Sequence, residues 1–163
     1  MKALWVASTL ELDDWCIAGG FVRNLVWDKL HGYQFSTPLN DIDLVYFDVH
    51  DISISTERGH EKRLNLLGDF PWSVKNQARM HIRNGDKPYQ STADALTYWV
   101  ELETIIGVRM TPDGEITLVS PFGIDALFQD TVSINKKRPK PTAFKERINS
   151  KKWLEIWPNL RVL

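Results

Sequence analysis

The stretch LNDIDLVYFD, residues Leu39–Asp48, decides how the rest of the chain is interpreted. Its apolar residues predict a buried β-strand, and Asp41 and Asp43 stand two residues apart at the start of that strand. Because side chains along a strand alternate between two faces, both carboxylates leave the sheet on the same side. Two ionised carboxylates in a poorly solvated place repel each other, and a divalent cation relieves that repulsion.

The chemistry of this pair favours a hard metal ion. Oxygen ligands without a nearby His or Cys select ions such as Mg²⁺, which complete their coordination shell with water and substrate phosphates. In the alternative interpretation, Asp41 is an exposed turn residue and only Asp43 points inward. Both interpretations are open from this stretch alone.

The segment WCIAGGFVRNLVWDKLHG predicts a strand, a glycine turn and a helix. The strand stops at Gly19-Gly20, and apolar residues at the three-and-four spacing of a helix follow, with Gly32 as the expected C-cap. A helix N-terminus carries unpaired N–H groups that attract phosphate. Gly19 and Gly20 are therefore candidate phosphate-binding residues, and Arg23, one turn into the helix, adds a cation. A double glycine alone is also compatible with a simple tight turn.

The composition is typical of a soluble globular protein. Of the 163 residues 43% are hydrophobic and 25% charged, and seven are tryptophans, which predicts one domain over residues 1–163 with a substantial core. No apolar run is long enough for a membrane span and no signal peptide is recognised, so the cytoplasm is the expected location. The single cysteine, Cys16, is expected to be a packed core thiol.

The net charge of −1 hides a basic segment at residues 136–152. It holds eight Lys or Arg and one Glu, a net charge of +7. Such a segment would contact phosphate groups or form a solvated, partly helical surface, and the two interpretations stand equal.

The remaining elements predict an α/β to α+β fold, a mixed β-sheet with helices packed against it. We expect a core at residues 1–80 with the order β-α-β-α-β and a C-terminal part at 91–163 with a hairpin and helices. The core includes a helix over about 55–67 and a strand beginning at PWSVKN. Further expected elements are a helix over 92–101, a hairpin around Pro-Asp-Gly at 112–114, a short helix in FGIDALFQD, and a terminal helix with a Trp153/Trp157 stripe.

AGGFVRNLVWDKLHG followed by NDIDLVYFD resembles the nucleotidyltransferase superfamily, which includes DNA polymerase β, CCA-adding enzymes, poly(A) polymerases and antibiotic adenylyltransferases. The style of the motif, Gly-Gly-x-Val-Arg with Asp-Ile-Asp, is similar to the CCA-adding branch. WSVKNQARMH, GVRM, SPFGIDALF and KKWLEIWPNL resemble an uncharacterised bacterial family classed as nucleotidyltransferase-like, over most of the chain.

The resemblance implies a reaction and a site. A hydroxyl of an unidentified acceptor (small molecule, RNA or protein) attacks the α-phosphate of a nucleoside triphosphate such as ATP, and pyrophosphate leaves, with two Mg²⁺ ions at the reacting oxygens. Asp41 and Asp43 would hold the metal, Gly19 and Gly20 would cradle the β- and γ-phosphates, and Arg23 would assist.

The superfamily pattern also has a third carboxylate on a later strand, and here the chain departs from it. On WSVKNQ the alternation 72, 74, 76 predicts Asn76 at that position, with Lys75 and Gln77 at the rim of the pocket. An amide can offer an oxygen to a metal but cannot accept a proton. The other candidate acids are Asp48, Glu57, Glu103 and Asp125.

Three functional hypotheses follow. The first is a Mg²⁺-dependent nucleotidyltransferase, and the second is a nucleotide-binding or regulatory module of the same fold with weakened catalysis, motivated by Asn76. The third is an RNA-binding protein that uses residues 136–152. His81 and Arg109 are further candidates for the rim of the cleft, each with a surface role as the alternative.

Overall fold

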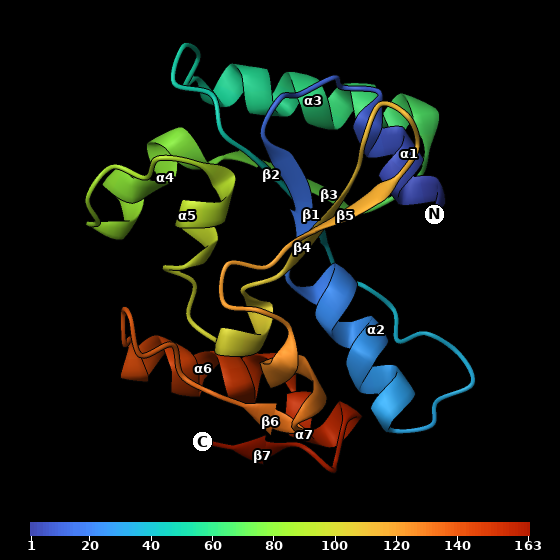
Figure 1. Ribbon diagram of the computed structural model, residues 1–163, viewed down its shortest axis with the longest axis vertical. Helices are drawn as coiled ribbons and strands as arrows, with labels where there is room; N and C mark the ends of the chain where they lie inside the picture. The colour runs from blue at the N-terminus through green and yellow to red at the C-terminus, as the bar shows by residue number, and fades with distance from the viewer.

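The computed structural model describes residues 1–163 and has a five-stranded sheet at its centre (Figure 1). The strand order is β3-β2-β1-β4-β5; β2 and β3 run parallel and the other neighbours antiparallel. The strands are β1 (Trp15–Ala18), β2 (Ile42–Tyr46), β3 (Trp72–Asn76), β4 (Gly107–Met110) and β5 (Ile116–Val119), and a separate pair is formed by β6 (Thr131–Val132) and β7 (Arg161–Val162).

Helices surround this sheet, which confirms the predicted mixed sheet with helices against it. The α-helices are α1 (Lys2–Ser8), α2 (Gly20–Leu30), α3 (Ile54–Leu67), α4 (Gln77–Asn84), α5 (Thr92–Leu96), α6 (Pro141–Lys151) and α7 (Trp153–Ile156), and the 3-10 helices are η1 (Leu102–Thr104) and η2 (Asp125–Phe128). No helix combines the length and the apolar character that crossing a membrane requires.

The two faces of the sheet are covered by different elements. Helices α1 and α3 lie over one face (Figure 1), where the apolar side chains of Ile17, Leu44 and Val74 form the largest core cluster with them. On the opposite face Cys16, Ala18 and Val45 pack against Leu96 and Ile105 from the α5 to η1 region. The expected packing of Cys16 is confirmed, and burial raises the pKa of its thiol far above the ordinary value.

A second core joins the C-terminal elements to α2. Trp27 contacts the rings of Trp153 and Trp157 edge to face, at centroid distances of 5.9 and 5.0 Å. Buried Asp28 fixes the same corner, because its carboxylate accepts hydrogen bonds from the Trp157 indole and from the Thr37 N–H and hydroxyl. The loop that leads into β2 is thereby tied to α2 and to the end of the chain.

Between residues 77 and 156 the chain departs from expectation at three places. Helix α5 ends at Leu96 instead of continuing to residue 101, and the terminal helix divides at Lys152, whose φ of 53° ends α6 and begins α7. Helix α4 was not expected, because its sequence QARMHIRN is short and mostly polar, and its apolar residues Ala78, Met80 and Ile82 alternate as in a strand.

Candidate functional site

The alternation of β2 separates a core face from a cleft face. Ile42, Leu44 and Tyr46 belong to the core on the α1/α3 side, so Asp43, between the first two of them, leaves the opposite face of the sheet. There it lines a cavity of about 260 Å³ together with residues from β3, α4, the segment between α5 and η1, η1 itself and α6. The cavity-lining residues are Asp43, Val45, Lys75, Gln77, Met80, Asn84, Tyr98, Trp99, Val100, Glu101, Thr104, Lys140 and Arg147.

The two aspartates of DID differ in their surroundings. Asp41 is exposed just before β2, whereas Asp43 is half-buried within the strand. Burial raises the pKa of Asp43, the negative charge of Asp41 raises it further, and a hydrogen bond with Ser73 and the charges of Lys151 and Arg147 oppose the rise. Burial and the charge of Asp41 therefore destabilise the ionised form of Asp43, and a bound cation would stabilise it.

The glycine turn opens α2 beside this pair. Gly19 has φ 60° and ψ −117°, and a Cβ there would lie 3.0 Å from the Trp99 ring. The Gly19 N–H donates to the Ile106 carbonyl, and its own carbonyl accepts from Val22 and Arg23. The N–H groups of Gly20 and Phe21, in the first turn of the helix, have no intrahelical acceptor.

Gly20, Asp41 and Lys151 line a small hollow of about 60 Å³ at this turn. The glycine turn, the exposed aspartate and the last residue of α6 therefore meet at one place, although Lys151 is more than a hundred residues from the other two in the sequence. Lys151 makes no ion pair within the chain.

Arg23 lines the same hollow but is packed beneath it. Its side chain is 6% exposed, with the guanidinium 4.8 Å from the Trp27 ring centroid and 4.6 Å from that of Trp153. Both Nε and Nη2 donate to the Asn24 side-chain oxygen. Burial lowers the pKa of Arg23 to about 10, so the group remains a cation at neutral pH. Its charge acts on the hollow from a fixed position in the core.

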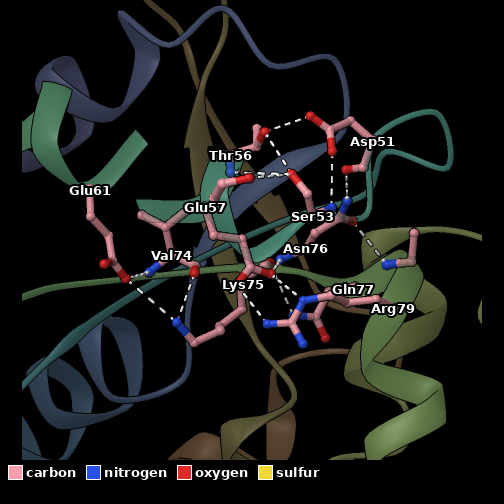
Figure 2. Close-up of polar contacts among 12 residues, drawn as sticks. Asp51, Ser53, Thr56, Glu57, Glu61, Val74, Lys75, Asn76, Gln77 and Arg79 are labelled. Carbon is pink, nitrogen blue, oxygen red and sulfur yellow. Dashed lines mark hydrogen bonds and ion pairs between the residues drawn. The ribbon is translucent and has the colours of Figure 1, made fainter. Parts of the chain in front are cut away.

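Asn76 is placed differently from the sequence prediction. It pairs with Tyr46 rather than Asp43, and its side chain turns toward the α3 side of the sheet. Its amide nitrogen donates to the backbone carbonyls of Asp48 and Asp51, and its side-chain oxygen accepts from the N–H groups of Asp48 and Ala78, as Figure 2 shows in part. Asn76 thus caps α4 and anchors the loop after β2. Residues 72, 74 and 76 of β3 face the core under α1 and α3, whereas the cavity with Asp43 lies on the opposite face of the sheet.

The residues of β3 that share the face of Asp43 are Ser73 and Lys75. Ser73 is the register partner of Asp43, and Lys75 is that of Val45. Lys75 lines the cavity while its ammonium group lies 2.9 Å from the Val74 carbonyl and 3.5 Å from Glu61. Gln77 also lines the cavity, as the sequence suggested for both rim residues.

The other acids considered from the sequence do not line the cavity. Glu57 forms an ion pair with Arg79, and Glu103 accepts hydrogen bonds from Thr131 and Ser133. Asp48 lies in a separate hollow with His50, and Asp125 is exposed in η2.

Glu101 is the cavity-lining acid that sequence reasoning missed. It is fully buried, and its carboxylate forms a two-point ion pair with Arg147 of α6, with nitrogen–oxygen distances of 2.5 and 3.2 Å. The available signal was an acidic residue inside the apolar run YWVELETII, which is rarely buried without a partner. Its partner, 46 positions away, is fixed only by the tertiary structure.

The basic segment does not form one uniform surface. Four of its eight cations are paired with carboxylates: Lys137 with Asp94, Arg138 with Asp86, Arg147 with Glu101, and Lys152 with Glu155. Lys140 and Lys151, which have no ion pair, line the cavity and the small hollow respectively. Lys140 and Lys151 therefore place unpaired positive charge in the two pockets that contain Asp43 and Asp41.

The two remaining rim candidates lie elsewhere. His81 packs against the Tyr89 ring at a centroid distance of 6.1 Å, and Arg109 lines a separate hollow with Trp5 and Trp15. Neither contributes to the cavity that contains Asp43.

Comparison with known proteins gives a consistent result. A family model described as Nucleotidyltransferase matches residues 6–162. A solution NMR structure described as revealing a CCA-adding enzyme head domain superposes with a TM-score of 0.80 at 28% identity, covering 99% of this chain and 87% of that one. A structure described as a tRNA-processing enzyme complex has a TM-score of 0.56 at 17% identity, covers 99% of this chain and 43% of that one, and supports the fold alone. No curated protein matches the sequence.

Proposed function

The chain belongs to a nucleotidyltransferase family, and from that premise we propose that it moves a nucleoside monophosphate from a nucleoside triphosphate to a hydroxyl acceptor, with Mg²⁺ as cofactor. The observation that carries the proposal is the placement of Asp43: a carboxylate of raised pKa, beside Asp41, in a cavity that Lys140 and Arg147 also line. A nucleoside triphosphate is found at high concentration in the cytoplasm, where we expect the reaction to occur.

The donor set fits Mg²⁺ bound with few protein ligands. No group of three or more His, Cys, Asp or Glu side chains is arranged to hold a metal ion, and Asp41 and Asp43 are two carboxylates alone. Mg²⁺ is commonly bound by one or two carboxylates, substrate phosphates and water. Asp41 and Asp43 would hold it, and when bound it would neutralise charge on the phosphate oxygens. Because Ser73 stands beside Asp43 where a carboxylate would complete a second site, we propose that the protein holds one ion firmly rather than two.

We assign the triphosphate to the glycine turn and α6. The free N–H groups at the start of α2 suit an anion, and Lys151 lies in the same hollow as Gly20. Lys140, which has no ion pair, adds positive charge to the cavity. Glu101 holds Arg147 in place through the ion pair, and Arg23 adds a buried positive charge below the turn. The acceptor hydroxyl attacks the α-phosphorus, the bond to pyrophosphate breaks, and the hydroxyl proton passes to water.

One observation favours a second candidate, a nucleotide-binding module with weakened catalysis. The position beside Asp43 is Ser73, and the acid that shares the cavity, Glu101, is already neutralised by Arg147. A site without a third free carboxylate would bind a nucleotide and turn it over slowly.

The test uses nucleoside triphosphates labelled on the α-phosphate, beginning with ATP, with Mg²⁺ and a cell extract as the source of acceptors. Transfer RNA is the first defined acceptor, since the solved relative is described as a CCA-adding enzyme head domain. We expect Asp43→Ala to abolish labelling and Asp48→Ala, on the same segment but in another hollow, to retain it. Equal labelling by Asp43→Ala and the wild type would overturn the proposal.

Calorimetry separates the two candidates. Nucleotide binding with no Mg²⁺-dependent release of pyrophosphate supports the binding module. Absence of binding removes both.

A further inference from the structure

The two edge strands of the central sheet, β3 and β5, differ in whether their outward backbone groups have hydrogen-bond partners. At β3, the backbone N–H groups that point outward are already satisfied by carboxylates of α3: Val74 donates to Glu61 at 2.9 Å and Asn76 to Glu57 at 2.7 Å. Figure 2 shows both contacts. An added strand would have to displace two buried or half-buried carboxylates, so this edge is closed to pairing.

At the other edge, β5 presents free backbone groups. The Thr111 N–H donates to the Glu115 carbonyl at the end of the hairpin, so in the alternating antiparallel pattern Thr117 and Val119 also bond inward to β4. The N–H and C=O groups of Ile116 and Leu118 therefore point away from the sheet. No side chain bonds to them, in contrast to the carboxylates at β3.

The side chains of β5 carry none of the usual protection against pairing. The strand reads Ile-Thr-Leu-Val without a charge, proline or bulge, and the side chains of Ile116 and Leu118 are 48% and 49% exposed. They border an apolar hollow of about 470 Å³ between β5 and α2, which Leu25 and Phe21 also line. An exposed apolar strand of this kind is a site for association.

We propose that β5 pairs with β5 of a second copy of this chain, antiparallel and about a two-fold axis at Thr117, to form a ten-stranded sheet across a dimer. In this register Ile116 lies opposite Leu118 of the second copy. Both residues direct their N–H and C=O groups outward, so each such pair exchanges two hydrogen bonds and the two-fold axis generates a second pair. The apolar side chains of both copies then share one face of the continuous sheet.

The charges along β5 and the blocked edge at β3 favour a closed dimer over an open filament of molecules. Opposite Glu115 the register places Val119 of the second copy, so no like charges face each other along the pairing. Pairing of β5 with β3 of another copy, which would propagate a filament, is blocked by Glu57 and Glu61. The pairing of β5 with itself uses the same surface on both copies and is complete at two.

Two kinds of variant test the dimer by light scattering during size exclusion over a range of concentrations. We expect the wild type to form dimers, Leu118→Lys to be monomeric because it places a charge in the pairing, and Leu66→Lys to remain dimeric, since Leu66 is 86% exposed on α3 away from β5. Circular dichroism verifies that each variant is folded. A monomeric wild type at every concentration overturns the proposal, and so does a dimer that persists in folded Leu118→Lys.

A cysteine scan tests the register itself. On the axis, Thr117 would face its own copy as a non-hydrogen-bonded pair, with Cα atoms about 4.5 Å apart, a separation that a disulfide accepts. Mild oxidation should therefore link Thr117→Cys into a covalent dimer. Glu115→Cys should stay unlinked, because in this register its copy lies roughly 13 Å along the strand. Buried Cys16 does not compete. Linking of Glu115→Cys in preference to Thr117→Cys would contradict the register.

Discussion

Asp43 and Ser73 are direct neighbours across β2 and β3, on the face of the sheet that lines the cavity. The Ser73 hydroxyl hydrogen bonds with the Asp43 carboxylate and opposes the effect of burial on its pKa. Three residues along the same strand, Asn76 turns to the other face and bonds to the loop after β2. A change at one of these two β3 positions should therefore alter the site, and a change at the other should alter the stability of the fold.

Asn76→Asp is expected to destabilise the protein without creating a metal ligand. The substitution replaces an amide nitrogen that donates to the Asp48 and Asp51 carbonyls with a charged oxygen, in a fully buried place. We expect a loss on the order of 3 kcal/mol in the free energy of unfolding, measured by urea denaturation. Asn65→Asp, exposed on α3, should change it by less than about 0.5 kcal/mol. A stable Asn76→Asp variant with tighter Mg²⁺ binding would contradict this assignment.

Ser73→Asp is expected to strengthen metal binding. A third carboxylate beside Asp41 and Asp43 adds a ligand, and it adds repulsion that a cation removes. We expect the variant to bind Mn²⁺ at least about tenfold more tightly than the wild type, equivalent to ~1.4 kcal/mol, by calorimetry. Its melting temperature should fall without metal and recover when metal is added. Ser73→Asn provides the control of similar shape without the charge, and equal Mn²⁺ affinity in both variants would show that this position does not face the metal.

The sequence was sufficient for the elements that carry a local signal. The strand-turn-helix at Gly19-Gly20 and the alternation of β2 predicted where Asp43 points, and the same alternation applied to β3 selects Ser73 and Lys75. The error at Asn76 arose from treating the buried face of β3 as the site face, although a sheet covered by helices on both sides has two inward faces. The ion pair of Glu101 with Arg147 and the approach of Lys151 to Asp41 depend on how α6 packs, which no local pattern specifies.

The buried carboxyl of Glu103 is expected to give the stability a pH dependence of known sign. Burial raises its pKa above the ordinary 4.5, and hydrogen bonds from Ser133 and Thr131 only partly oppose the shift. The folded protein therefore holds this proton more tightly than the unfolded chain does. The free energy of unfolding contributed by Glu103 should fall as the pH rises from about 4.5 through the folded-state pKa, and then become constant.

Glu103→Gln cannot ionise and should lose this slope. The measurement is urea denaturation of both proteins from acidic to neutral pH, and the quantity compared is the difference between the two curves. The comparison of slopes is needed because the amide also changes the hydrogen bonds to Ser133 and Thr131 at every pH. Parallel curves would show that Glu103 has the same proton affinity in the folded and unfolded states.

Gly19→Ala is expected to weaken both stability and nucleotide binding, whereas Gly20→Ala should leave them nearly unchanged. At Gly19 a Cβ meets two obstacles: the backbone is at φ 60° and ψ −117°, and the Trp99 ring is 3.0 Å away. The backbone strain alone costs on the order of 1–3 kcal/mol. Displacement of Trp99 would also disturb the cavity that it lines with Asp43. At Gly20 the nearest atom is Arg23 Nη2 at 3.4 Å, where ordinary van der Waals contact begins, and the residue is helical, so alanine is favourable there. Thermal unfolding and ATP titration of both variants test this difference, and a Gly20→Ala variant impaired as strongly as Gly19→Ala would mean that close approach of the substrate, rather than backbone conformation, requires the glycines.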